Sequence, residues 1–155
     1  MQTSKKFSPR EVFLKSLRLQ LKDVSAEADL FAENGVMEFP FTPQGHSTRI
    51  EGREAIRTFL TKNGFSSNRL KLNAHNGLSI HETKDPEIII VEGCSEVTWV
   101  PTKTNYSLPF IQLLQIRNSE IFLCRDYVNP ISAFRAMGGL ELLSKMFSKE
   151  VELNK

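Results

Sequence analysis

The chain has 155 residues, of which 40% are hydrophobic and 25% are charged, and its formal net charge at pH 7 is +2. This length and composition indicate one globular domain with a hydrophobic core of its own. Lysine and arginine are scattered and the longest basic run is Lys5-Lys6, which argues against a nucleic-acid partner.

The sequence shows no segment that would direct the chain to a membrane or to secretion. No apolar run reaches transmembrane length, and residues 1–10 are polar and lack the hydrophobic stretch of a signal peptide. Cys94 and Cys124 have neither CxxC spacing nor a histidine placed for a metal site. We therefore expect a cytoplasmic protein without a membrane partner, in which both thiols are buried and reduced.

Helical patterns dominate the first half of the chain. Ser8 is a suitable N-cap, Pro9 a suitable first residue and Glu11 a suitable third residue, as in a capping box, for a helix in which Phe13 and Leu17 recur at spacing four. The expected helices span residues 9–22, 25–31 and 53–62, and extended segments are expected at 36–41 and 48–51.

After Gly64 the apolar residues alternate with polar ones, which is the spacing of strands. The expected strands span 69–75, 88–99, 110–116 and 120–128, and a terminal helix follows them. Three helices followed by a meander predict an α+β domain, with a strongly bent antiparallel sheet wrapped around the N-terminal helices. We expect its interior to contain Phe13, Leu17, Phe59 and Trp99.

Asp126 is the most informative residue, because it lies near the end of the apolar strand that begins at Ile121. Burying an unpaired carboxylate costs several kcal/mol or raises its pKa. Either a ligand pocket with acid–base chemistry or a salt bridge to Arg125 or another cation would explain it. Strand alternation places Arg125 and Asp126 on opposite faces, which favours the pocket.

Three segments resemble the nuclear transport factor 2-like superfamily, and within it the SnoaL-like polyketide cyclases and the phenazine biosynthesis A/B-type proteins. They are Leu-Phe-Ala-Glu-Asn-Gly-Val-Met-Glu-Phe at 30–39, Ile-Glu-Gly-Arg-Glu-Ala-Ile at 50–56 and Arg-Asp-Tyr-Val-Asn-Pro at 125–130. The resemblance covers about residues 9–138. It is specific for the fold and weak for function, because this fold hosts isomerases, cyclases, dehydratases, hydrolases and binding domains.

The resemblance implies a cone-shaped α+β barrel with an apolar cavity that opens at one end. It also implies one SnoaL-like domain over residues 1–155, with a core at about 9–138 and a helical tail at 139–155. Proteins of this type commonly form homodimers through the outer sheet face.

Asp126 resembles the carboxylate that acts as the general acid in the phenazine-type proteins. Those proteins also use a histidine on the third helix, where this chain has Phe59 and no histidine, so imine-forming chemistry is not expected. Gln112 is a lone amide on an apolar strand face, and a buried amide needs a partner. Asp126, a ligand carbonyl or a backbone group would each serve.

Eleven phenylalanines against two tyrosines and one tryptophan favour a dry core or cavity lining over hydrogen-bonded recognition, and most of them are expected in the core. A cavity lined by the others would suit a flat, apolar, aromatic or polycyclic ligand. The expected ligand-binding residues are Phe13, Leu17, Phe41, Phe59, Trp99, Phe110 and Gln112. His46 and His75 could shuttle protons, because the ordinary pKa of histidine is near neutrality, but both have polar neighbours and are expected at the surface. Neither a cofactor nor a metal is predicted, because the sequence has no phosphate loop and no metal-binding cluster.

Two functions follow. As an enzyme, the protein would use Asp126 in cofactor-free isomerisation, cyclisation or dehydration of a small apolar carbonyl compound. As a non-catalytic ligand-binding or dimerisation domain, it would hold Asp126 ionised and salt-bridged. Ile111 and Phe110 lie on opposite faces of their strand, and both faces are apolar. Because the helices can cover only one of them, we expect a homodimer through the outer face of the sheet.

Overall fold

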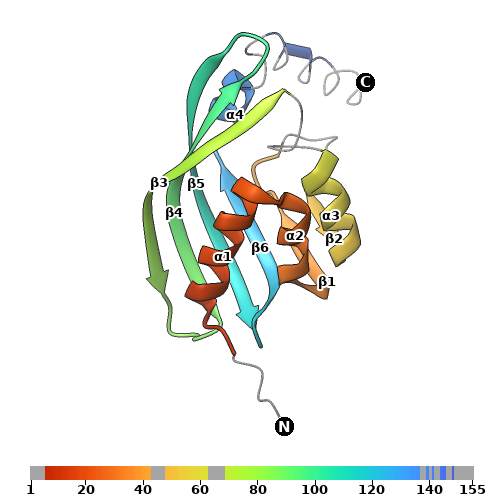
Figure 1. Cartoon of the computed structure of the whole chain (residues 1–155), viewed down its shortest axis with the longest axis vertical. Helices are drawn as coiled ribbons and strands as arrows, with labels where there is room; N and C mark the ends of the chain where they lie inside the picture. The colour runs from red at the N-terminus through yellow and green to blue at the C-terminus, as the bar shows by residue number, and fades with distance from the viewer. Residues whose placement is uncertain are drawn as a thin grey trace.

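The computed structural model describes residues 6–42, 48–62 and 69–136, together with 139, 141, 144, 145 and 148. Helices cover one face of a bent six-stranded sheet, which gives the molecule the cone-shaped α+β architecture that the sequence predicts (Figure 1). The helices are α1 (Pro9–Lys22), α2 (Val24–Glu27), the 3-10 helix η1 (Ala28–Leu30), α3 (Arg53–Lys62) and α4 (Pro130–Ala136). The strands are β1 (Phe31–Glu38), β2 (Arg49–Glu51), β3 (Leu70–Glu82), β4 (Ile88–Trp99), β5 (Thr104–Arg117) and β6 (Glu120–Val128).

The strand order is β2-β1-β6-β5-β4-β3, and every neighbouring pair is antiparallel except β1 and β6. The meander β3–β6 is as predicted, but the wholly antiparallel sheet is not. The chain leaves β1 and crosses the whole meander before its last strand returns beside β1. Phe31 therefore pairs with Ile121, and Glu38 with Arg125, in parallel register.

The second helix is shorter than the sequence suggests, because β1 begins at Phe31. A bulge shifts the register between Phe31 and Val36. Gly35 lies in this bulge, and a Cβ there would come within 2.9 Å of the carbonyl oxygens of Ala32 and Ile121. A residue without a side chain is required for this close approach of two backbones.

Local sequence signals set the ends of two helices. Ser8 and Glu11 form the predicted capping box of α1, in which the Glu11 amide donates to Ser8 Oγ and the Ser8 amide donates to Glu11 Oε2. At α4, Asn129 Oδ1 accepts a hydrogen bond from the Ile131 amide at 3.0 Å, and Pro130 is the first helical residue.

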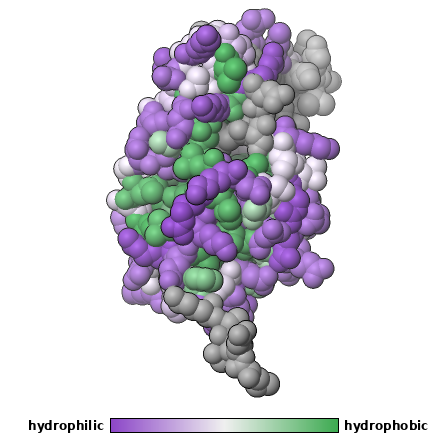
Figure 2. All heavy atoms as spheres, viewed as in Figure 1, coloured by the Kyte–Doolittle hydropathy of each residue, from purple (hydrophilic) through white to green (hydrophobic). Residues whose placement is uncertain are grey.

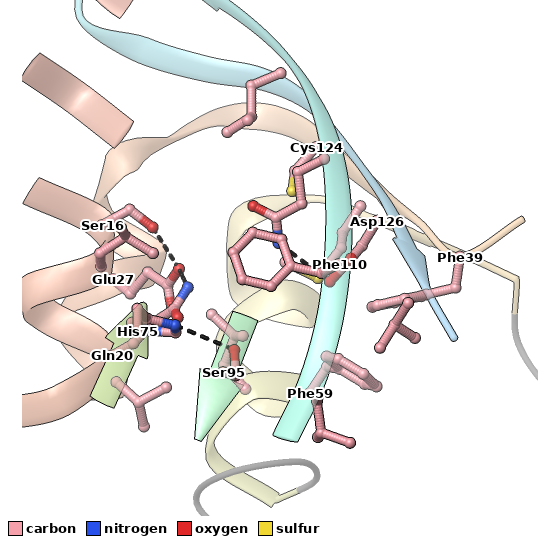
Figure 3. Close-up of a pocket in the computed structure, with 18 of the residues that line it drawn as sticks. Ser16, Gln20, Glu27, Phe39, Phe59, His75, Ser95, Phe110, Cys124 and Asp126 are labelled. Atoms are coloured by element: carbon pink, nitrogen blue, oxygen red, sulfur yellow. Dashed lines mark hydrogen bonds between the residues drawn. The ribbon is translucent and has the colours of Figure 1, made fainter. Parts of the chain in front are cut away.

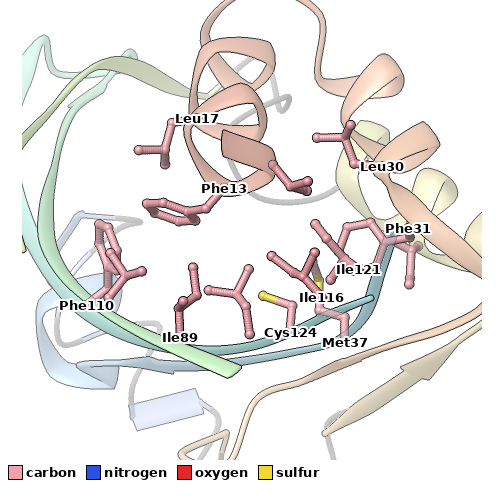
Figure 4. Close-up of a cluster of buried hydrophobic side chains, with 14 residues drawn as sticks. Phe13, Leu17, Leu30, Phe31, Met37, Ile89, Phe110, Ile116, Ile121 and Cys124 are labelled. Carbon is pink, nitrogen blue, oxygen red and sulfur yellow. The ribbon is translucent and has the colours of Figure 1, made fainter. Parts of the chain in front are cut away.

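The main hydrophobic core lies between the helices and the concave sheet face (Figure 4). Phe13 and Leu17 are buried in it, as predicted, and Phe59 packs against it. A second cluster lies where α4 packs against β4 and β5, and it includes Trp99 and Ala136. Figure 2 views the side that carries the helices, where hydrophobic atoms show between hydrophilic side chains.

None of the described helices combines the length and hydrophobicity needed to cross a lipid bilayer. His46 lies outside the described residues, as does most of the segment 139–155. The domain limits and the helical tail therefore stay predictions.

A candidate acid–base site in an apolar cavity

A cavity of about 340 Å³ lies between the helices and the concave face of the sheet. That volume is within the range of small-molecule sites, roughly 300–1,000 Å³. Its walls are mainly apolar, and the polar groups that reach them are few (Figure 3). They are Ser16 and Gln20 of α1, Glu27 of α2, His75 of β3, Ser95 of β4, Gln112 of β5 and Asp126 of β6.

Asp126 lies on the cavity side of β6, directly opposite Gln112 of β5. Gln112 Nε2 donates a hydrogen bond of 3.1 Å to Asp126 Oδ2, while Oδ1 is buried and has no partner among the described residues. Burial raises the pKa of Asp126 to about 6, against the opposing effect of the Gln112 hydrogen bond. The carboxyl group can therefore exchange protons near neutral pH.

Arg125 does not pair with Asp126. Its Nε donates to Glu38 Oε2 at 2.7 Å on the other side of the sheet, as the alternation of strand residues predicts. Within the described part of the chain, no cation forms an ion pair with Asp126. Among the described residues, Asp126 therefore lacks the salt bridge that would have given it a purely structural role.

Glu27 is a second buried carboxyl group, with only 3% of its surface exposed. Its Oε1 accepts hydrogen bonds from Ser16 Oγ and Gln20 Nε2, both at 2.6 Å, and its Oε2 is buried without a partner among the described residues. Burial raises the pKa of Glu27 to about 7, the two hydrogen bonds lower it, and the charge of Asp126 raises it further. In Figure 3 Glu27 lies beside the helices, whereas Asp126 extends from the sheet.

Sequence reasoning missed Glu27, although a signal was present. Ser16 and Gln20 interrupt the helix face that carries Phe13 and Leu17, so two polar side chains point from α1 toward the core. Polar groups on a buried helix face require partners, and a carboxyl group on the next short helix supplies them.

His75 also belongs to the cavity, which corrects its expected place at the surface. The register of β3 shifts between Leu72 and Ala74, so His75 faces the same side as Leu72. His75 Nδ1 lies 3.1 Å from Ser95 Oγ, and Nε2 is buried without a partner among the described residues. Burial lowers the pKa of His75, so its ring is neutral at pH 7.

Four of the predicted ligand-binding residues line the cavity: Leu17, Phe59, Phe110 and Gln112. Three do not. Phe13 is part of the closed core, and Trp99 lies in the cluster beneath α4. Phe41 follows the end of β1 and is 57% exposed, with its ring 5.4 Å from that of Tyr127.

Cys124 is the cavity's thiol, and it is buried and free, as predicted. Cys94 is also free but only partly buried, which corrects its expected burial. Burial raises the pKa of Cys124 well above its ordinary value, with smaller contributions from Asp126 and Glu27. A thiol held in its neutral form is a poor nucleophile. Asp126 and Glu27 are the carboxyl groups of the cavity, and burial raises the pKa of each to near neutrality, which suits proton transfer.

No family model matches the chain. Over 138 residues it is 32% identical to an uncharacterised PhzA/B-like protein of Pseudomonas aeruginosa, an alignment that covers 88% of this chain and 95% of that protein. The structure is similar to that of a candidate isomerase from Bacillus subtilis, with a TM-score of 0.76, 28% identity and coverage of 84% and 92%.

Likeness of fold extends to more distant proteins. A phenazine biosynthesis-related protein from Pseudomonas aeruginosa has a TM-score of 0.65 at 20% identity, with 84% of each chain covered. Solved structures described as NTF2-like and as SnoaL-like polyketide cyclase share the fold at TM-scores of 0.64 and 0.62.

Proposed function

The chain belongs to the PhzA/B-like proteins, within the nuclear transport factor 2-like superfamily, and we propose that it transfers protons on a small apolar carbonyl compound through Asp126. The reaction would be an isomerisation, cyclisation or dehydration that needs no cofactor. One observation carries this proposal: the Asp126 carboxyl group lies in an apolar cavity, with one oxygen unpartnered and no described cation beside it.

The proton would move at Asp126 Oδ1. Gln112 occupies Oδ2, so the ionised form, present above pH about 6, offers Oδ1 to a hydrogen on the carbon next to the carbonyl group. The apolar walls, Phe59 and Phe110 among them, would hold a flat aromatic or polycyclic body beside it. A PhzA/B-like relative and a structure described as a candidate isomerase are consistent with such chemistry.

The test is deuterium exchange into 2-tetralone, a flat bicyclic ketone, followed by proton NMR in D2O. We expect the protein to accelerate exchange at the carbon between the carbonyl group and the ring. Asp126→Asn should lose this acceleration, whereas Glu33→Gln, which changes an exposed carboxylate on β1, should retain it. Undiminished exchange in Asp126→Asn would overturn the proposal and favour a non-catalytic ligand-binding domain.

We also propose a homodimer through the outer face of the sheet. Ile111 of β5 is 44% exposed on this face, which also carries the half-buried Leu113 of β5 and Leu123 of β6. An apolar strand face left open to water favours association with a second copy.

A further inference from the structure

Glu27 has a carboxyl group whose two oxygens differ in their surroundings. Ser16 and Gln20 both donate to Oε1 at 2.6 Å, while Oε2 is buried with no partner among the described residues. The residue is 3% exposed and lines the cavity. A buried polar atom that protein groups leave unsatisfied in a cavity is a candidate contact for a ligand.

The surroundings of Glu27 favour its neutral form. The titratable groups that line the same cavity are Asp126 and Cys124 of β6 and His75 of β3, and within the described chain no cation pairs with Glu27. Burial and the charge of Asp126 both raise the pKa of Glu27, to about 7. Because Oε1 already accepts two hydrogen bonds, the proton of the neutral group lies on Oε2.

The neutral carboxyl group therefore presents an O–H donor for which the described residues supply no acceptor. We propose that this donor binds an oxygen atom of the ligand, so that the cavity selects compounds with a carbonyl oxygen or an equivalent acceptor. The inference rests on the proposed function and deepens it, because it adds a specificity-determining residue that recognises the oxygen of the carbonyl compound.

The two carboxyl groups then have complementary roles. Ionised Asp126 takes a proton from the carbon beside the carbonyl group, and the electron pair of that C–H bond moves to the carbonyl oxygen, giving an enolate. The Glu27 O–H donates to this oxygen and stabilises its negative charge. Return of the proton from Asp126 to the same carbon, as the carbonyl bond re-forms, completes an exchange. In a β,γ-unsaturated ketone the proton can return to the γ carbon instead, while the carbon–carbon double bond moves to the α,β position, which yields an isomer with no net gain or loss of protons or electrons.

A structural role for Glu27 must be separated from this one, because its hydrogen bonds also tie α2 to α1. Glu27→Gln makes the separation. The amide oxygen of glutamine can accept from Ser16 and Gln20, while its NH2 group donates into the cavity at every pH. Glu27→Leu keeps a similar volume but removes the donor.

The experiment compares the affinities of 2-tetralone and tetralin, its analogue without the carbonyl group, by NMR titration at pH 5.5 and pH 8.5. Comparing the two compounds in each variant cancels the difference in their hydration. The quantity compared is the ratio of the affinity for 2-tetralone to the affinity for tetralin. We expect this ratio at pH 5.5 to be about tenfold lower in Glu27→Leu than in the wild type. Glu33→Gln should match the wild type.

The pH dependence distinguishes the roles further. In the wild type the ratio should fall more between pH 5.5 and 8.5 than it does in Glu27→Gln, because Asp126 titrates in both chains but Glu27 titrates only in the wild type. A ratio that is unchanged in Glu27→Leu, or equally pH-dependent in Glu27→Gln, would overturn the role of Glu27. If Glu27 fails these tests but deuterium exchange still depends on Asp126, the proposed function stands. If the affinity ratios are as expected but no exchange is observed, only the proposed function is overturned.

Discussion

Gln112 and Asp126 face each other across β5 and β6, and one hydrogen bond of 3.1 Å joins the amide to a single oxygen of the carboxyl group. The amide thus stabilises the ionised form of Asp126 and at the same time leaves the other, buried oxygen without a partner among the described residues. Removing the Gln112 amide should therefore change the pKa of Asp126 measurably.

Gln112→Leu should raise the pKa of Asp126 above its value of about 6, because desolvation would then act without the opposing hydrogen bond. Carbon-13 NMR titration of the carboxyl group measures this. Gln115→Leu, on the same strand, is the control and should leave the pKa of Asp126 where it is. A fall in the pKa of Asp126 in Gln112→Leu would contradict the proposal that the Gln112 hydrogen bond opposes the effect of desolvation.

Glu27 should make the protein less stable as pH rises. Its pKa is raised from 4.5 to about 7 on folding, so the folded state holds a proton that the unfolded chain releases. Between pH about 4.5 and 7 the free energy of unfolding should therefore decrease, by on the order of 3 kcal/mol from this group. Urea unfolding of the wild type and Glu27→Gln at pH 5 and pH 8 tests it.

The Glu27→Gln variant should lose less stability than the wild type over that interval, since its amide does not titrate. Comparing the two chains removes the contributions of other groups, including His75, whose lowered pKa acts in the opposite direction. Equal losses in both chains would show that Glu27 does not titrate as described.

Gly35→Ala should destabilise the fold by roughly 1–3 kcal/mol, because the new Cβ would approach two backbone oxygens to 2.9 Å and neither can move independently of its strand. Gly77→Ala serves for comparison. At Gly77 nothing lies within 4 Å of the new atom, and only the positive φ of 60° opposes the change. Denaturant unfolding should give the larger loss for Gly35→Ala.

The homodimer can be tested at Ile111. Sedimentation of the wild type at tens of micromolar should show a dimer, and Ile111→Lys should shift it to monomer by placing a charge on the outer face. Leu21→Lys is the matched control, because Leu21 is similarly exposed but lies on α1. A monomeric wild type would exclude the proposed interface.

Features that depend on neighbouring residues could be predicted from the sequence. The capping box of Ser8 and Glu11 and the opposite orientation of Arg125 and Asp126 are of this kind. The place of His75 was not predictable from alternation, because a bulge before it reverses the faces of the strand. Glu27 escaped for another reason: its partners come from a different helix, and only the packing of α1 on α2 brings them together.

The parallel pairing of β1 with β6 has a consequence for synthesis on the ribosome. Because Phe31 pairs with Ile121, the edge of β1 that faces β6 stays unpaired until residue 121 has emerged. During that interval β1 lacks the strand that covers this edge, and unpaired strand edges are a condition under which nascent chains aggregate or recruit chaperones. Chains truncated before Glu120 should accordingly aggregate rather than form a smaller stable domain.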